Sequence, residues 1–365
     1  MTAKTLDARL LVLCTVRAGL DSLSAVLQHG ANIVCVVGVA EPQEEARDSI
    51  SGWADIRLFA LQHSIPFIEV QDYTLRATDD REKFSSLDFD LIWVAGWQRL
   101  VPPWLMSLAK WGAIGAHGSP DGIEKGRGRS PQNWAILMGA DTFAVSIFRL
   151  TPEVDDGAVI ATQTIPLNPW DNIATSYKKV ALAVANLVIG VVREPDLLTR
   201  ATNQEGPFFY YPKRIPSDGM VDWSMTQREI WSHCNALRHP YPGLRTQVDK
   251  GGLIKIWSCQ PFKSEQTSSA IGRIEFVFQD GSFLVTCGDG QLLVTEYESE
   301  ALSWTPQVGC LLLGRPFSDT LREIIQRHES LGQHQPLAPR IQALWARYCP
   351  SLDESSEAVG QENDH

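Results

Sequence analysis

The stretch that decides the fold is Gly112-Ala-Ile-Gly-Ala-His-Gly-Ser-Pro-Asp-Gly-Ile-Glu-Lys-Gly-Arg-Gly-Arg-Ser-Pro-Gln-Asn-Trp134. A short apolar run leads to His117, and a basic loop rich in glycine follows it. Pro131 stands where the first turn of a helix tolerates proline. We therefore expect a strand, a histidine at its carboxyl end, a permissive loop and then a helix. Open α/β sheets build their ligand sites at this edge.

Other apolar runs place this strand within a larger sheet. Strands alternating with helical segments predict a mostly parallel, Rossmann-like α/β sheet in which 112–117 is the fifth strand. The segment 151–157 is too short for a crossover helix, so the runs at 141–150 and 158–166 should pair antiparallel at the sheet edge. A helix at about 172–192 closes the domain. The four earlier runs are 9–14, 32–39, 65–70 and 88–95.

A second domain is expected after a segment rich in turn formers and aromatic residues at 203–219. One helix at about 225–237 and five short runs separated by glycine turns predict a small OB-like β-barrel. Two helical patterns and an acidic, disordered tail follow. We therefore expect a catalytic domain at 1–202, an OB-like domain at 203–315 and a helical extension at 316–365. The five runs are 252–259, 271–278, 282–287, 291–297 and 309–313, and the two helical patterns are 318–330 and 338–348.

Bulk composition limits the partners and the compartment. The 365 residues carry a formal net charge of −11, which argues against a nucleic-acid partner. The seven cysteines are scattered, without metal-ligand spacing, so we expect free thiols and no metal. The amino-terminal segment lacks the apolar region of a signal peptide, and the most apolar helix, 180–192, is too short to span a bilayer. We expect a cytoplasmic protein without a membrane partner.

Two side chains could carry acid–base chemistry. The sheet order brings His117, after the fifth strand, and Asp155, from the 151–157 turn, to the same edge. A histidine and a carboxylate placed together can move protons near neutral pH. The alternatives are a histidine with a structural hydrogen bond, and ordinary turn chemistry for Asp155-Asp156-Gly157.

The surrounding residues also permit two interpretations. Lys125, Arg127 and Arg129 could contact a phosphate or form a solvated loop, and no P-loop motif is present. Trp97, just after Gly96 and beyond the fourth strand, could line a slot for a planar ligand or pack in the core.

Taken together, the motifs resemble the folate-dependent formyltransferase family. The ordered set is His117-Gly-Ser119, Lys125-Gly-Arg-Gly-Arg-Ser-Pro131, Asn133-Trp-Ala-Ile-Leu-Met-Gly139 and Val154-Asp-Asp-Gly-Ala-Val-Ile160. The second domain resembles the carboxyl-terminal domain found in this family through Asp218-Gly-Met-Val-Asp-Trp223, Pro240-Tyr-Pro-Gly243, Ile254-Lys-Ile-Trp257 and Cys287-Gly-Asp-Gly290.

The resemblance implies transfer of a formyl group from 10-formyltetrahydrofolate to a primary amine, without a metal. By position, His117 and Asp155 are similar to the family's catalytic histidine and aspartate. The family's usual asparagine two residues before the histidine is replaced by Gly115, and we expect Asn133, a water or a rearranged loop to supply its hydrogen bond. The resemblance implies folate contacts at Gly96, Trp97, Val154 and Asp156, and acceptor contacts at Ser119, Lys125, Arg127 and Arg129.

Three functions remain open. A formyltransferase acting on a nucleotide-linked amino sugar or another small amine is favoured. The alternative is methionyl-tRNA formyltransferase, against which the acidic balance and the lack of a lysine-rich insertion at 119–131 count. A non-catalytic folate-binding protein is the third, and retention of His117 and Asp155 counts against it. The sequence leaves the oligomeric state open, with a homodimer as one alternative.

Overall fold

The computed structural model describes residues 6–39, 52–248, 252–263, 270–300, 304–331 and 335–350, which form two compact units. The first unit holds the chain up to Glu124 together with Thr142–Leu167 and Thr175–Pro207. The second holds Lys125–Asp141, Asn168–Ala174 and the chain from Phe208. Lys125–Asp141 and Asn168–Ala174, which we expected within the first domain, are therefore grouped with the second unit, and the first unit ends at Pro207 instead of residue 202.

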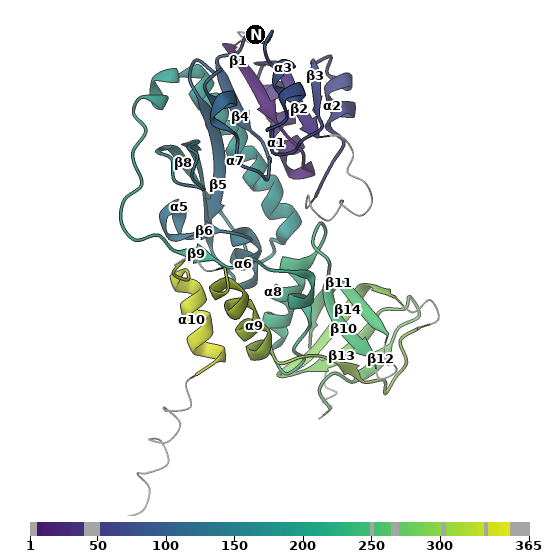
Figure 1. The fold of residues 1–365 in the computed structure, drawn as a ribbon. Helices are drawn as coiled ribbons and strands as arrows, with labels where there is room; N and C mark the ends of the chain where they lie inside the picture. The colour runs from purple at the N-terminus through teal and green to yellow at the C-terminus, as the bar shows by residue number, and fades with distance from the viewer. Residues whose placement is uncertain are drawn as a thin grey trace, which may run out of the picture. The chain divides into compact units, whose positions relative to one another are not determined.

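The first unit is built on a seven-stranded sheet with the order β3-β2-β1-β4-β5-β7-β8 (Figure 1). The five strands from β3 to β5 are parallel to one another, and β7 pairs antiparallel with both β5 and β8. The mostly parallel sheet with an antiparallel edge is confirmed. The strands are β1 (Leu6–Leu13), β2 (Ala31–Val39), β3 (Phe67–Val70), β4 (Leu91–Val94), β5 (Ala113–Ser119), β7 (Thr142–Arg149) and β8 (Val159–Pro166).

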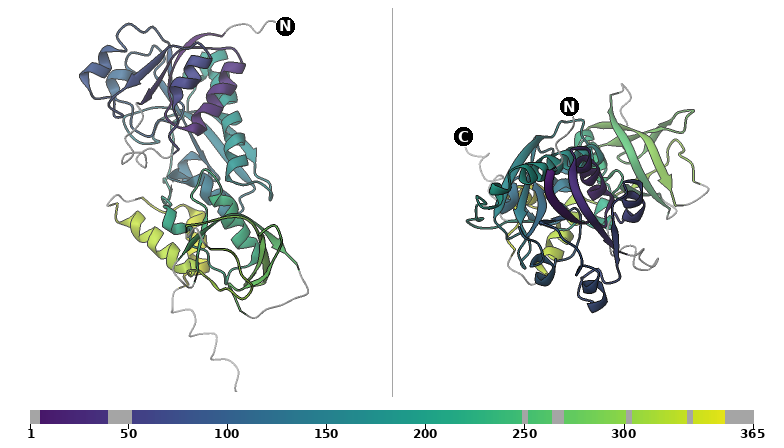
Figure 2. Two further views of the ribbon diagram at one scale, coloured as in Figure 1. Left: turned by 90° about the vertical axis from the view of Figure 1, so that its right-hand side faces the viewer. Right: turned by 90° about the horizontal axis from the view of Figure 1, so that it is seen from above.

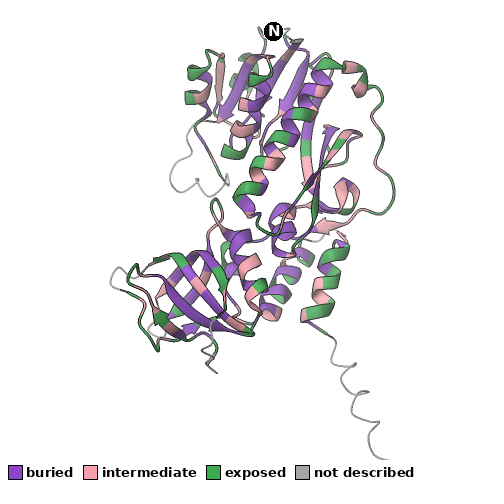
Figure 3. Ribbon diagram, turned by 180° about the vertical axis from the view of Figure 1, so that it is seen from behind, coloured by how far each residue is buried: buried purple, intermediate pink, exposed green. Residues whose placement is uncertain are grey.

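Helices cover both faces of this sheet because its central strands are apolar throughout. Leu10, Leu11, Val12 and Leu13 of β1 are all fully buried, which requires cover on either side (Figure 3). Helices α1 and α7 lie side by side on one face (Figure 2), where Nζ of Lys178 donates to Asp21 at 2.6 Å. The helices are α1 (Arg17–Gln28), α2 (Ile56–Gln62), α3 (Thr78–Glu82), α4 (Pro103–Met106) and α7 (Ile173–Arg193), with the short α5 (Gly122–Lys125) after β5.

Helix α7 closes the sheet, as expected for 172–192. With 21 residues it is longer than the 180–192 segment that we judged too short for a bilayer. By length and composition it could cross a membrane, but half of its most apolar window is buried inside the protein. Val188, Ile189 and Val191 are among its buried residues. The helix packs here as the core helix of an α/β unit.

The second unit contains a six-stranded antiparallel sheet with the order β12-β13-β14-β11-β10-β15. The sheet curls until its ends meet, because the amide of Leu312 donates to Gly272 and that of Ile274 donates to Cys310. This arrangement agrees with the predicted OB-like barrel. The strands are β10 (Leu244–Val248), β11 (Leu253–Phe262), β12 (Ile274–Val277), β13 (Phe283–Cys287), β14 (Gly290–Ser299) and β15 (Leu312–Leu313).

Helices and one small strand pair complete the second unit. Helix α8 begins with a capping box, in which Thr226 and Glu229 satisfy each other's backbone amides. The expected helical extension is present as α9 and α10, and the acidic end of the chain lies outside the described residues. The elements are α6 (Pro131–Leu137), α8 (Gln227–Leu237), α9 (Phe317–Glu329) and α10 (Pro339–Tyr348), with the strands β6 (Arg127–Gly128) and β9 (Tyr210–Tyr211) pairing in parallel.

Candidate active site

His117 lies on a part of β5 that extends beyond its parallel neighbour. Strand β4 pairs with Ala113 and Ile114 of β5, whereas β7 pairs with β5 from Ile114 through Ser119. Among the described strand pairs, the half of β5 that carries His117 therefore pairs with β7 and not with β4. The His117 side chain is 10% exposed. A partly buried imidazole at a sheet edge can reach a ligand and still be held in position.

Asp155 reaches the histidine from the loop between β7 and β8. Its Oδ2 lies 3.6 Å from Nδ1 of His117, and its side chain is 22% exposed. The distance fits an ion pair when the imidazole is protonated. It is longer than a tight hydrogen bond, as is common for catalytic pairs without bound substrate. The structure thus brings together the two residues that the sequence proposed as an acid–base pair.

The loop that carries Asp155 is fixed by its own backbone contacts. Asp155 itself has a φ of +52°, in the left-handed region that few side chains adopt. Nε2 of Gln204 donates to the carbonyls of both Asp155 and Gly157 at 2.8 Å. A Cβ atom on Gly157 would lie 1.6 Å from the carbonyl oxygen of Arg149. Glycine at this position lets the loop approach β7 closely, and the approach sets the position of Asp155.

Next to His117 on β5, Gly115 is surrounded by apolar side chains. Residues two apart on a strand share a face, so a side chain at position 115 would stand next to the histidine. A Cβ atom there would lie 2.9 Å from Cδ2 of Leu150, and the ring of Phe148 is 3.6 Å away. A side chain at position 115 would therefore require the Leu150 side chain to move.

Asn133 is engaged elsewhere. The residue is fully buried in α6, its Nδ2 donates to the carbonyl of Ala236, and its Oδ1 accepts from Arg214 at 2.9 Å. Arg214 also donates to the carbonyl of Asp218 at 2.9 Å. Both ends of the amide are thus used inside the second unit. These contacts weigh against the expectation that Asn133 supplies a catalytic hydrogen bond.

Gly96 and Trp97 differ from the expected ligand slot. Gly96 has a φ of +93°, and a Cβ on it would lie 2.4 Å from Val16, so close packing requires glycine. Its carbonyl accepts from both the amide and Oγ1 of Thr15. Trp97 is 6% exposed and meets the ring of Tyr73 edge to face within the core. The ring of Trp97 therefore packs in the core, which was the second of the two alternatives, and a contact between Trp97 and folate stays a prediction.

The other residues expected to contact folate lie in the loop between β7 and β8 or beside Gly96. Nε1 of Trp97 is a buried donor without a partner among the described residues, as are the ring nitrogens of Trp53, Trp93 and Trp231. Val154 is 65% exposed, and Asp156 is also exposed in the same loop. The folate contacts at Val154 and Asp156 remain predictions.

Of the four residues expected to contact the acceptor, two are buried and two are exposed. Ser119 is fully buried, and its Oγ accepts from the amide of Asp121. The guanidinium of Arg127 is buried against Phe208, 3.5 Å from the ring centroid. Neither arrangement leaves these side chains facing solvent, contrary to the expectation that they meet an acceptor. Lys125 and Arg129 are exposed.

Sequence comparison with known proteins covers both units. A family model described as "Formyl transferase" matches residues 15–192, and one described as "Formyl transferase, C-terminal domain" matches residues 214–303. The methionyl-tRNA formyltransferase of Dechloromonas aromatica is 26% identical over 263 residues, covering 72% of this chain and 82% of that protein. The enzyme of the same name from Bacillus subtilis is 25% identical over 280 residues, covering 76% and 85%.

Solved structures share the fold. HypX from Aquifex aeolicus, in complex with tetrahydrofolic acid, superposes with a TM-score of 0.57 at 17% identity, covering 87% of this chain and 48% of HypX. The chain therefore spans about half the length of HypX. An N-formyltransferase from Helicobacter canadensis, in complex with folinic acid and dTDP-3-aminofucose, has a TM-score of 0.51 at 15% identity, covering 79% and 99%. With both family models matched in order along one chain, this protein belongs to the folate-dependent formyltransferase family.

Proposed function

We propose that this enzyme transfers a formyl group from 10-formyltetrahydrofolate to a primary amine, with His117 and Asp155 as its catalytic pair. The observation that carries the proposal is the 3.6 Å approach of Nδ1 of His117 to Oδ2 of Asp155. The pair lies where β5 extends past β4, and hydrogen bonds from Gln204 hold the loop that carries Asp155. Both residues also stand at the positions that resemble the family's catalytic histidine and aspartate.

His117 and Asp155 have different roles in this reaction. When bound, the folate supplies a formyl group on N10; the amine nitrogen bonds to the formyl carbon as the bond to N10 breaks, and the proton that the amine loses goes to N10. His117 donates a hydrogen bond to the formyl oxygen, where negative charge develops. Asp155 keeps the imidazole oriented and assists the proton transfer.

We further propose that the acceptor is a small amine, with a nucleotide-linked amino sugar favoured. Support comes from the net charge of −11 and from Lys125 and Arg129, exposed cations that suit acceptor phosphates. Methionyl-tRNA is the second candidate, because the similar curated sequences carry that name. All seven cysteines are free thiols, which supports a reducing compartment such as the cytoplasm.

An acceptor panel tests the proposal. The purified chain is incubated with 10-formyltetrahydrofolate and, separately, with nucleotide-linked amino sugars, amino acids and charged initiator tRNA, and each product is examined by mass spectrometry. The proposal expects one formyl group added to a small amine, with no addition by an Asp155→Asn variant. Formylation of the tRNA alone would establish the second candidate. Folate binding without any formylated product would contradict the catalytic assignment.

A further inference from the structure

The loop that follows β4 begins beside the part of β5 that carries His117. In the parallel register, Trp93 of β4 is opposite Ile114 of β5. Strand β4 ends at Val94, whereas β5 continues past His117 to Ser119. Ligands of open α/β sheets bind outside the carboxyl ends of the strands. The conformation of the loop after β4 therefore affects any ligand that reaches the histidine.

A chain of hydrogen bonds through two hydroxyl groups ties this loop together. The amide of Gln98 donates to the hydroxyl of Tyr73 at 2.7 Å. That hydroxyl lies 3.1 Å from Oγ1 of Thr15, which donates to the carbonyl of Gly96 at 3.0 Å. Because an amide can only donate and each hydroxyl carries one proton, Tyr73 must donate to Thr15. We call these bonds the hydroxyl bridge, and they join the residues on either side of Trp97.

The segment that carries Tyr73 is itself held in place. The carboxylate of Asp80, which is almost fully buried, accepts from the amides of Gln71 and Asp72. The carboxylate of Asp72 accepts from backbone amides within residues 74–77. The Tyr73 hydroxyl is therefore presented to the loop from a well-supported position.

The ring of Tyr73 contacts the same loop independently of its hydroxyl. It meets the ring of Trp97 edge to face, with centroids 4.8 Å apart, and the guanidinium of Arg99 lies 4.9 Å from its centroid. Burial raises the pKa of the Tyr73 phenol above its ordinary value, so the hydroxyl keeps the proton that it donates. Phenylalanine at this position would keep both ring contacts and remove the hydroxyl alone.

We propose that Tyr73 is a positioning residue for the formyl donor, acting through the hydroxyl bridge on the loop formed by residues 96–99. The inference rests on the proposed function, in which the donor contacts Gly96 and Trp97. A loop that already has its binding conformation loses less freedom when the donor binds, so the bridge increases the affinity for the donor. The bond-making step stays with His117 and Asp155. Loss of the bridge should therefore weaken donor binding without slowing turnover.

Calorimetric titration of the full chain with folinic acid tests donor binding in the absence of turnover. Tyr73→Phe and Thr15→Val each remove one hydroxyl of the bridge, and each should weaken binding about tenfold. The variant with both changes should bind no more weakly than the worse single variant, because either change alone already breaks the bridge. Parent-like affinity in Tyr73→Phe would overturn the proposal.

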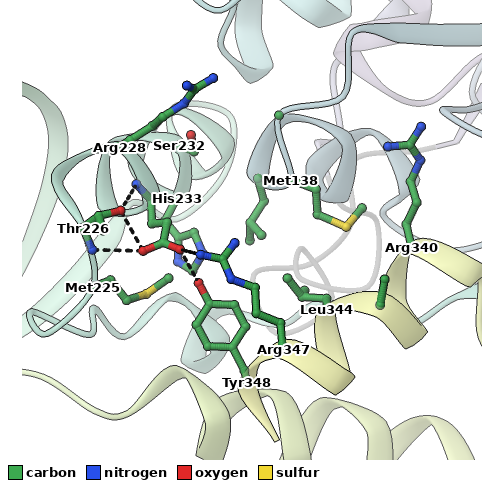
Figure 4. A pocket seen from close by; sticks show the side chains of 14 residues that line it. Met138, Met225, Thr226, Arg228, Ser232, His233, Arg340, Leu344, Arg347 and Tyr348 are labelled. Atoms are coloured by element: carbon green, nitrogen blue, oxygen red, sulfur yellow. Dashed lines mark hydrogen bonds and ion pairs between the residues drawn. The ribbon is translucent and has the colours of Figure 1, made fainter. Parts of the chain in front are cut away.

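Tyr348→Phe is the matched control for the loss of a tyrosine hydroxyl. The hydroxyl of Tyr348 on α10 donates to Glu229 of α8 at 2.8 Å, so it also joins two elements, both within the second unit (Figure 4). This bond is not part of the hydroxyl bridge, and the affinity of Tyr348→Phe for folinic acid should equal that of the parent. An equal loss of affinity in Tyr348→Phe and Tyr73→Phe would contradict the specific role of Tyr73.

Steady-state kinetics separate positioning from catalysis and from a purely structural role. With the acceptor that the panel identifies, Tyr73→Phe should raise the KM for 10-formyltetrahydrofolate about tenfold and leave kcat unchanged. A lower kcat, or a lower unfolding midpoint, with an unchanged KM would overturn the assignment. A parent enzyme that does not bind folinic acid would contradict the proposed function itself. A parent that binds it no better than Tyr73→Phe would contradict this inference alone.

Discussion

Leu150 fills the space beside Gly115, because a Cβ atom on that glycine would lie 2.9 Å from Cδ2 of Leu150. Position 115 shares a face of β5 with His117. Where the sequence resemblance implies an asparagine beside the histidine, this chain therefore has packed hydrocarbon. The effect on catalysis can be measured by placing an asparagine at position 115, once with Leu150 present and once with Leu150 replaced by alanine.

Gly115→Asn alone is expected to lower both stability and turnover. Overpacking against Leu150 should reduce the free energy of unfolding by about 1–3 kcal/mol. Gly115→Asn with Leu150→Ala provides room for the amide beside His117. In other enzymes, removing one hydrogen-bond donor to a developing oxyanion costs about a hundredfold or more in rate. An asparagine that has room to donate should recover part of such an effect, so the double variant should exceed the single variant in kcat by about tenfold. Steady-state kinetics of both variants decide this, and a single variant faster than the double would count against the packing argument.

Gly157→Ala is expected to lower both kcat and the free energy of unfolding. The new methyl group would clash with the carbonyl of Arg149 and displace the loop that holds Asp155. A displaced acid–base partner should cost about tenfold to a hundredfold in kcat. Gly190→Ala in α7 is the matched control, because a Cβ there meets nothing within 4 Å. The control should keep full turnover and gain stability. Full activity of Gly157→Ala would show that the loop geometry does not matter.

Asn133→Ala should act on stability rather than on chemistry. Removing the amide leaves the buried Arg214 without one of its acceptors, at a cost of about 1–3 kcal/mol in the free energy of unfolding. Burial already lowers the pKa of Arg214 to about 10. Urea unfolding and kcat should be compared on the same preparation. A large fall in kcat with an unchanged unfolding midpoint would instead return Asn133 to the catalytic site.

The pH dependence of unfolding should carry the signature of His233. Burial and Arg214 lower its pKa to about 3 in the folded state, whereas an unfolded histidine takes up a proton near its usual pKa. Between these values the unfolded chain binds more protons, so stability is complete above about pH 6.5 and falls as pH drops, by up to about 1.4 kcal/mol per unit. Urea titrations over this range should show a shallower slope for His233→Gln and an unaltered slope for Ser232→Ala. An identical slope in the His233→Gln variant would contradict this assignment.

Most strands could be predicted because runs of apolar residues in the sequence become the buried strands. The parallel strands around Leu10–Leu13 and the five runs of the second unit stand where apolar residues cluster. Strand β10 was missed because its central buried residue is Thr246. That hydroxyl accepts from Nε1 of Trp223 and donates to the carbonyl of Leu313, contacts that no local pattern encodes.

Side-chain orientation within the site was less predictable. His117 and Asp155 followed from strand order, since two loops at one sheet edge must be close. The core packing of Trp97 depends on Tyr73, and the stacking of Arg127 depends on Phe208, both distant in sequence. Long-range contacts of this kind decide whether a polar or aromatic residue in a glycine-rich loop faces a ligand or the interior.

The most direct measurement of the central claim is a double-mutant cycle on formyl transfer. His117→Gln, Asp155→Asn and the combined variant are compared with the parent enzyme in kcat/KM, using the acceptor that the panel identifies. Each single variant should lose about a hundredfold or more, and the double variant should lose little beyond the worse single one, because the two side chains act as a unit. Parent-like kcat/KM in either single variant would contradict the account.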